Sequence, residues 1–190
     1  MAEYLEIVLN SSLLVALVGI LYKFYADKRK KQKPFSKALE DKAQVKSLME
    51  VFRLTNNLIR VQILKGENGG RPKPESRFYS SIVEEVMGEG SPSAKERWQK
   101  QPVDTQYHDM LNQMVSKTSH IIETSKMQTS MLKDIYVKYN IGGSVVALIS
   151  ENQDRMIYVS IHFKSIEDID TANFRDNLRV FTQNLKKIFH

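Results

Sequence analysis

The sequence predicts an α+β domain, an antiparallel sheet with flanking helices, behind a single N-terminal transmembrane helix. Three observations predict this class: an uncharged apolar run near the N-terminus, mixed strand-like and helix-like hydrophobic spacing after residue 36, and a heptad-like stripe near the C-terminus. The chain has 190 residues, enough for one compact domain and an appendage.

Composition excludes several classes of protein. Hydrophobic residues make up 42% of the chain and charged residues 26%, which excludes a disordered or low-complexity protein. The chain has no cysteine, so a disulfide scaffold, a thiolate zinc site, an iron–sulfur cluster and a cysteine nucleophile are excluded. None of its four histidines has a second ligand at a recognised spacing. We therefore expect no metal and no cofactor.

The whole net charge of +6 comes from one short segment of the chain. Seven basic residues and one acidic residue lie between Lys23 and Lys37, and the remainder of the chain has equal numbers of both signs. A nucleic-acid-binding domain spreads its Lys and Arg over a folded face. We therefore expect no nucleic-acid partner, and we look for a local reason for the basic cluster.

The residues before the cluster predict a membrane span within residues 1–25, after a short external tail. No residue from Ile7 to Tyr22 is charged. A helix needs about 20 residues to cross the hydrocarbon core, and Leu5 to Tyr25 supplies them with tyrosines at both ends. A cleaved signal peptide would carry its positive charge before the apolar run, and an interfacial helix would be amphipathic; neither pattern is present.

The flanking charges predict the orientation. Basic residues follow the span, so residues 26–35 form a basic juxtamembrane linker on the cytoplasmic side. We expect a single-pass protein of the cell (inner) membrane, with its N-terminus outside and residues 36–190 as a cytoplasmic domain. The linker should attract anionic lipid at about 1 kcal/mol per base. Its membrane-surface residues are Lys28, Arg29, Lys30, Lys31 and Lys33.

The first half of the cytoplasmic part predicts a helix and a hairpin. A helix begins at about Ser36, and residues 58–65 alternate as a strand, with Arg60 and Gln62 on the side opposite to Ile59, Val61 and Ile63. The Asn-Gly-Gly segment at 68–70 is typical of a turn. Residues 78–87 then form the second strand of a hairpin with a long loop.

The second half predicts helices around a second hairpin. Residues 88–102 form a loop that contains Trp98, and helices follow at 103–115 and 130–139. The segment 118–124 fits either a strand or a continuation of the first of these helices. Strands at 144–150 and 156–163 form the clearest hairpin. The last helix carries a stripe at heptad-like spacing, Phe174, Leu178, Phe181, Leu185 and Ile188.

This order of elements resembles a GAF domain, the sensor fold related to PAS. The segment MLKDIYVKYNIGGSVVALISENQDRMIYVSIHF resembles the closing half of such a domain, and LIRVQILKGENGGRPKPESRFYSSIVEEV resembles its opening hairpin. The resemblance covers Ser36 to His190. It implies a central antiparallel sheet covered by helices, a small-molecule pocket, and a homodimer formed by long first and last helices, with the stripe of the last helix at the interface.

The sequence also departs from that family. It has no N-K-x-F-D-E run of the kind found in cyclic-nucleotide-binding members, and without cysteine a thioether-linked bilin is impossible. No kinase, cyclase, phosphodiesterase or DNA-binding region follows the domain. We therefore expect either that the output is a partner protein or that the sensing role has been lost.

The resemblance also implies where a ligand would bind. The pocket candidates are Trp98, Tyr107, Met110, His120, Met131, Tyr136 and Ser144. Core packing is the alternative, because aromatic and Met residues at helical spacing usually belong to a core. Adjacent Glu84 and Glu85 point to opposite faces of a strand, so we expect solvation rather than paired acid–base chemistry. No serine lies in a Gly-x-Ser-x-Gly context, so we expect no catalytic residues and no enzyme.

Two functions follow. The first is a membrane-anchored GAF-like regulatory or sensory module that binds a small molecule or a protein partner in the cytoplasm. The alternative is a ligand-free membrane tether or interaction protein, possibly encoded by a phage or mobile element.

Overall fold

In the computed structural model, the residues described are 35–68, 78–152, 155–168 and 172–189. The expected membrane span and nearly all of the basic linker lie outside these ranges. Within them, no helix combines the length and the apolar character needed to cross a bilayer.

Internal contacts divide the chain into two units, Met1–Lys42 and Ala43–His190. The described part of the first unit is the start of helix α2 (Phe35–Thr55), where the Lys37 ammonium lies 3.7 Å from a Glu40 oxygen and 3.4 Å from an Asp41 oxygen. The second unit holds the remainder of α2 and every other element described below.

One six-stranded antiparallel sheet forms the centre of the second unit, with the strand order β3-β2-β1-β6-β5-β4. Both expected hairpins are confirmed, and β1 pairs with β6 to join them. The segment that fitted either a strand or a helix is strand β4, because helix α3 ends at Lys117 and the next residue, Thr118, has a φ of 63°. The strands are β1 (Arg60–Asn68), β2 (Phe78–Met87), β3 (Gln101–Pro102), β4 (Ser119–Glu123), β5 (Gly143–Glu151) and β6 (Arg155–Phe163).

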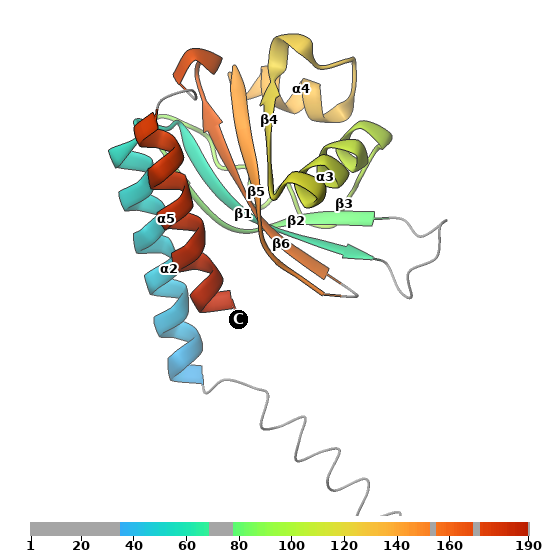
Figure 1. Cartoon of the computed structure of the whole chain (residues 1–190). Helices are drawn as coiled ribbons and strands as arrows, with labels where there is room; N and C mark the ends of the chain where they lie inside the picture. The colour runs from blue at the N-terminus through green and yellow to red at the C-terminus, as the bar shows by residue number, and fades with distance from the viewer. Residues whose placement is uncertain (1–34, 69–77, 153–154, 169–171, 190) are drawn as a thin grey trace, which may run out of the picture. The chain divides into compact units, whose positions relative to one another are not determined.

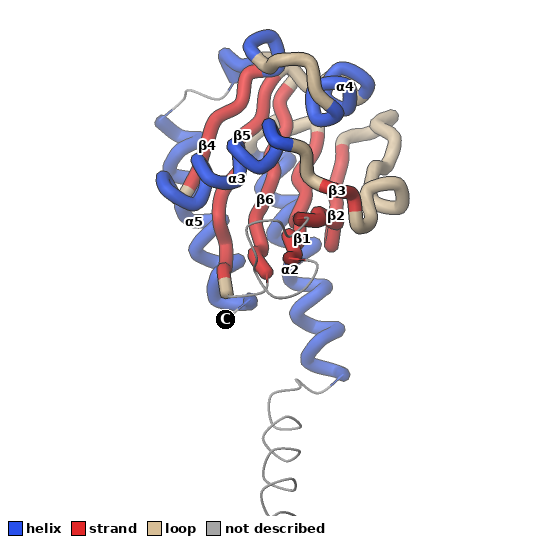
Figure 2. The backbone as a smooth tube through the Cα atoms, turned by 90° about the vertical axis from the view of Figure 1, so that its right-hand side faces the viewer, coloured by secondary structure: helices blue, strands red, loops and turns tan. Residues whose placement is uncertain are grey.

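Helices cover both faces of this sheet (Figure 1). Helix α2, from Ala43 onward, and α5 (Ala172–Phe189) lie on one face, and α3 (Thr105–Lys117) and α4 (Met131–Lys138) lie on the other. Figure 2 views the sheet from the α3 and α4 side. Short 3-10 turns, η1 (Thr124–Lys126) and η2 (Ile166–Asp168), follow β4 and β6.

Capping side chains set where α3 and α4 begin. The Asp104 carboxylate accepts a hydrogen bond from the Tyr107 N–H at 2.8 Å, and the Ser130 hydroxyl accepts one from the Lys133 N–H at 3.2 Å. Each satisfies a backbone donor that the helix itself leaves unpaired.

The α2 and α5 face of the sheet is apolar. The strand alternation predicted for residues 58–65 holds from Arg60 onward, with Val61 and Ile63 in the core beneath α2 and α5. Ile59 packs instead on the opposite side, because β1 begins only at Arg60. The sheet residues of this first core cluster are Val61, Ile63, Val86, Val145, Ala147, Ile149, Val159, Ile161 and Phe163.

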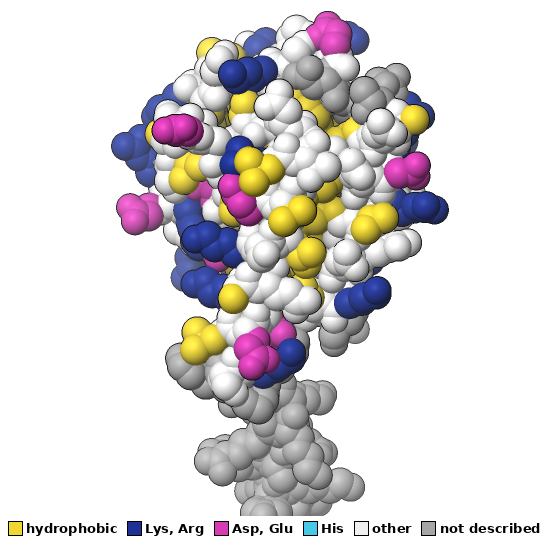
Figure 3. Space-filling view, turned by 90° about the vertical axis from the view of Figure 1, so that its left-hand side faces the viewer, with side chains coloured by type: hydrophobic (Ala, Val, Ile, Leu, Met, Phe, Trp, Pro, Cys, Tyr) yellow, Lys and Arg dark blue, Asp and Glu magenta, His cyan; other side chains and the backbone are white. Residues whose placement is uncertain are grey.

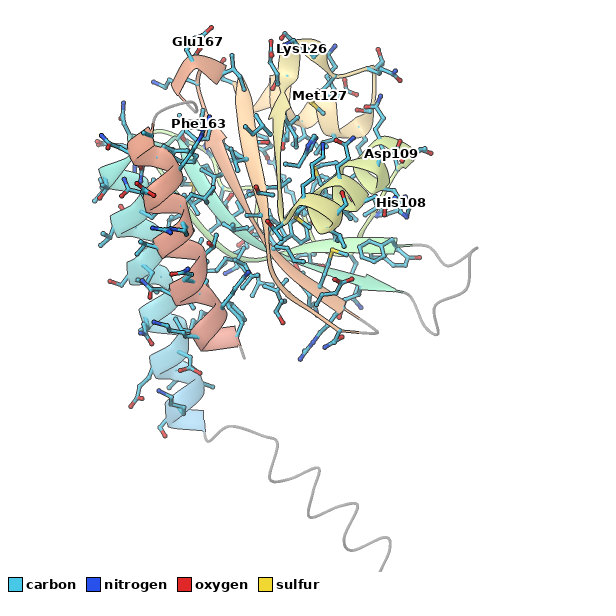
Figure 4. The ribbon with its side chains drawn as sticks, viewed as in Figure 1. His108, Asp109, Lys126, Met127, Phe163 and Glu167 are labelled. Carbon is cyan, nitrogen blue, oxygen red and sulfur yellow. The ribbon has the colours of Figure 1, made fainter. Side chains whose placement is uncertain are left out.

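Helix α5 packs its heptad-like stripe against this core. Phe174, Phe181 and Leu185 are buried there, and Leu178 and Ile188 are partly buried against it. The Phe181 ring stacks on Phe52 of α2 with 4.2 Å between centroids. Phe163, near the top of β6 in Figure 4, lies 5.1 Å from the Phe174 ring. The three buried members of the stripe are therefore packed within this chain and are not available to a second chain.

On the opposite face, residues 88–100 run along the part of β2 that β3 does not pair with, and we call these residues the strap. The Ile82 N–H donates to the Trp98 carbonyl at 2.9 Å, the Gln99 side chain donates to the Ile82 carbonyl at 2.9 Å, and the Lys100 N–H donates to the Ser81 hydroxyl at 2.8 Å. These bonds fix the strap along β2, beside α3 and α4.

Candidate functional site

Polar residues occupy the centre of the sheet face that lies under α3, α4 and the strap. The register places Arg60 of β1 beside His162 of β6, and Gln62 beside Ser160. His162 is also paired with Ser144 of β5. All five are buried. A sheet face covered by helices is normally apolar, so this polar floor requires a separate explanation.

Four of these residues, Arg60, Gln62, Ser160 and His162, form the floor of a cavity of about 30 Å³. A water molecule requires roughly 10–15 Å³ of cavity space, so this cavity accommodates two or three waters. The full lining consists of Arg60, Gln62, Leu64, Ile82, Ala94, Trp98, Tyr107, Met110, Leu132, Ile135, Tyr136, Ile141, Val146, Tyr158, Ser160 and His162.

Arg60 connects the floor of the cavity to its roof. Its Nη2 donates to the Pro92 carbonyl of the strap at 2.6 Å, and its guanidinium lies 4.5 Å from the centroid of the Tyr139 ring at the end of α4. Its Nε lies 3.3 Å from Glu85 Oε1 but is not aligned for a hydrogen bond. Burial lowers the pKa of Arg60 and the Glu85 charge opposes that shift; an arginine remains protonated under such conditions.

Glu85 holds the strap through several hydrogen bonds. Its carboxylate accepts from the Ser93 hydroxyl at 2.6 Å, from the Ala94 N–H at 3.0 Å and from the Lys95 N–H at 3.2 Å. It also accepts from the Gln62 amide at 2.7 Å. The expectation of solvated carboxylates at this position was wrong, because the strap covers this edge of the sheet and buries both Glu84 and Glu85.

His162 is buried and neutral at pH 7. Its Nε2 lies 2.8 Å from the Ser160 hydroxyl, and its ring lies 5.5 Å from that of Tyr136. Its Nδ1 has no hydrogen-bond partner. Burial, with a smaller contribution from the Arg60 charge, lowers the pKa of His162 from 6.5 to about 3.

A second polar group lies between the floor and α3. The hydroxyls of Ser80, Tyr107 and Tyr158 form a closed triangle, with oxygens 3.2, 2.8 and 2.5 Å apart, and the Trp98 indole donates to Ser80 at 3.3 Å. Burial raises the pKa of Tyr107 to about 12, and burial followed by the neighbouring Tyr107 raises that of Tyr158 well above 10. Both phenols are therefore neutral hydrogen-bonding groups.

The structure separates the pocket candidates that the family resemblance implied. Trp98, Tyr107, Met110 and Tyr136 line the cavity, where they also belong to the second hydrophobic cluster. Ser144 lies just behind them and hydrogen-bonds to the Tyr136 hydroxyl at 2.8 Å.

The other two candidates, His120 and Met131, are not among the cavity-lining residues. Met131 is half-buried at the start of α4, and its neighbour Leu132 reaches the cavity instead. His120 borders a separate open groove between α3 and η1, where Asp109, Lys126 and Met127 also lie (Figure 4). Partial burial, with a contribution from Lys117, lowers the pKa of His120.

Sequence reasoning missed the polar floor. Arg60, Gln62, Ser160 and His162 occupy alternate positions in strands whose other positions are apolar, which is also the pattern of a sheet with one face in water. The signal that distinguishes the two cases is the pair of helices predicted at 103–115 and 130–139, which must cover this face.

The described part of the chain holds no cluster of three His, Asp or Glu side chains that could bind a metal ion. The site thus consists of one buried ion pair, a neutral histidine and several hydroxyl and amide groups around a small cavity. Such groups can donate and accept hydrogen bonds to a small molecule.

Solved structures with the same fold are GAF domains. The chain is similar to a far-red cyanobacteriochrome photoreceptor at 18% identity, over 93% of this chain and 97% of that one, with a TM-score of 0.56. It is similar to GAF3 of Slr1393 from Synechocystis in its photoproduct state at 11% identity, over 77% and 90% of the two chains, with a TM-score of 0.56. It is also similar to a phycocyanobilin-bound GAF domain from a cyanobacterial phytochrome. That match has 13% identity over 90% of this chain and 92% of the other, with a TM-score of 0.52.

The expected α+β, GAF-like fold is therefore confirmed. No protein-family model and no curated protein matches the sequence. At these identities the similarity establishes the fold and not the ligand.

The lowered pKa of His162 predicts a pH-dependent stability. Below pH 6.5 the unfolded chain binds a proton at this histidine while the folded chain does not, down to about pH 3. The free energy of unfolding should therefore fall with decreasing pH through this window, by up to about 1.4 kcal/mol per pH unit. Urea unfolding between pH 6.5 and pH 5, where carboxylates contribute least, measures the slope.

The variant His162→Gln should flatten that slope, whereas His108→Gln, at an exposed position of α3, should keep it. An equal loss of stability in the wild type and His162→Gln over this window would contradict the burial argument.

Proposed function

We propose that the chain is a membrane-anchored, GAF-like regulatory module that binds a small molecule in the cavity beneath the strap. The proposal assigns it no reaction of its own, and its output passes to a protein partner. One observation supports the small-molecule input most directly. The site buries Arg60, Gln62 and His162 together with Glu85, at positions where apolar residues of similar volume would give comparable or greater stability.

The GAF-domain neighbours support a small-molecule input on this fold, since one of them is phycocyanobilin-bound. The input proposed for this chain is different. The chain offers no thiol for a covalent bilin, and a cavity of about 30 Å³ does not admit a tetrapyrrole. A much smaller molecule fits the dimensions.

The same small volume favours the second candidate function, a ligand-free tether that holds a partner at the membrane. Native mass spectrometry of the full chain, released gently from detergent, separates the two functions. The sensor predicts a non-covalently bound small molecule that is lost in Ala94→Val, because Ala94 lines the cavity and a larger side chain fills it. A spectrum of the bare chain alone would contradict the sensor and support the tether.

We also propose that residues 1–25 anchor the domain in the inner membrane. The uncharged run from Ile7 to Tyr22 and the basic residues after it support this. Cell fractionation should recover the intact chain with membranes at both low and high salt. Replacing Leu13 and Leu17 by Asp should release it, whereas Ala replacements should not. Recovery of the unprocessed wild type in the soluble fraction would contradict the anchor.

A homodimer is the third part of the proposal, and we assign it to the outer surface of α2 and α5. Val51 and Leu54 of α2 and Val180 of α5 are 60%, 63% and 53% exposed. Figure 3 shows this face with hydrophobic side chains along its middle and Lys and Arg mainly toward its sides. A second copy presents the same uncharged strip, and anchoring in one membrane raises the effective concentration of that partner.

Paired substitutions test this surface. Val51→Asp with Val180→Asp should weaken dimerisation at least tenfold in sedimentation of the full chain, and should change the free energy of unfolding by less than about 0.5 kcal/mol. Phe181→Ala provides the contrast, because it opens a cavity beneath α5 and should cost about 3–5 kcal/mol of stability. An unchanged dimer in the double Asp variant would exclude this surface.

A further inference from the structure

Two nitrogen atoms of cavity-lining side chains have no hydrogen-bond partner, Arg60 Nε and His162 Nδ1. The Arg60 side chain is 4% exposed and His162 is 3% exposed, so bulk water does not satisfy either atom. Leaving such a buried group unpaired costs about 1–3 kcal/mol, and native proteins rarely do so. The two atoms therefore mark a position where a buried water or another small bound molecule completes the hydrogen bonding.

The charges around the cavity sum to zero. Arg60 is neutralised by Glu85, whose Oε1 lies 3.3 Å from Arg60 Nε, and His162 is neutral at pH 7. The three tyrosines of the lining, Tyr107, Tyr136 and Tyr158, have pKa values raised by burial and are also neutral. A charged molecule placed here would lack a counter-charge of its own, and an uncompensated buried charge costs several kcal/mol.

The rest of the lining is apolar. Beside the polar groups of β1 and β6, the cavity is bordered by aliphatic and Met side chains from the sheet, the strap, α3, α4 and the short segment between α4 and β5. These residues are Leu64, Ile82, Ala94, Met110, Leu132, Ile135, Ile141 and Val146. A fitting molecule thus has one polar edge and one apolar side.

Resting on the proposed sensory function, we infer that the cavity binds a small uncharged molecule of the amide or azole class. Its acceptor atom receives the hydrogen bond of Arg60 Nε, and its second polar atom faces His162 Nδ1. Its apolar side lies against Leu132 and Ile135 of α4.

Binding of this kind acts on the strap. The same guanidinium donates from Nη2 to the Pro92 carbonyl at 2.6 Å, and Glu85 holds Ala94 and Lys95. A molecule that engages Arg60 Nε therefore acts on the same side chain that holds the strap. The position of residues 88–100 is therefore the feature of the domain that changes with occupancy.

Acetamide and acetate form a matched pair of probes, because they have nearly the same shape and differ in charge. In full-length chain labelled with ¹⁵N at Arg and His, acetamide should shift the Arg60 Nε–Hε and His162 ring signals saturably. We expect a dissociation constant on the order of 10 mM for a probe of four heavy atoms. Acetate should bind at least tenfold more weakly. Ala94→Val should abolish the acetamide response, and Lys186→Ala, at an exposed position of α5, should leave it unchanged.

Equal or tighter binding of acetate would overturn the uncharged class, and no response to acetamide would overturn the inference entirely. The acetamide experiment and the native mass spectrum test the inference and the sensory proposal separately. A native mass spectrum with a bound species, combined with no acetamide response, removes this inference and keeps the sensor. A bare chain that nevertheless binds acetamide contradicts the sensor and keeps the site.

Discussion

The pairing of Arg60 with Glu85 is the interaction on which the arrangement of the cavity depends. Glu85 alone would be a buried carboxylate and Arg60 alone a buried cation, each costing several kcal/mol. Together they also supply the bonds that hold the strap, through Pro92 on one side and residues 93–95 on the other. The ion pair thus joins adjacent strands β1 and β2 to the segment that covers them.

The two faces of the sheet have different roles. Under α2 and α5 the strand side chains are apolar, and aromatic stacking between Phe52 and Phe181 holds the helices in place. Under α3 and α4 the same strands carry the polar floor, and hydrogen bonds such as Tyr136 to Ser144 hold the helices above it. One face is therefore packed through apolar side chains, whereas the other combines a second apolar cluster with buried polar groups and a cavity.

The fold was largely predictable because its signals are local. Alternation from Arg60 onward in the first hairpin and over 156–163 in the second, and the heptad-like stripe of the last helix, each specify one element. The site was less predictable from the sequence. Arg60 and Glu85 become partners only through the β1–β2 register, and Glu85 is buried only because a strap with no periodic pattern covers it. Such burial depends on tertiary contacts that sequence spacing does not encode.

Trp98 is the single tryptophan of the chain. It lies within the strap, donates to Ser80 at 3.3 Å and stands edge-on to the Tyr107 ring with 6.2 Å between centroids. The intrinsic tryptophan fluorescence of the protein therefore originates entirely from this segment. Its emission wavelength and quenching provide a built-in optical reporter of how the strap sits, with no need for an introduced dye.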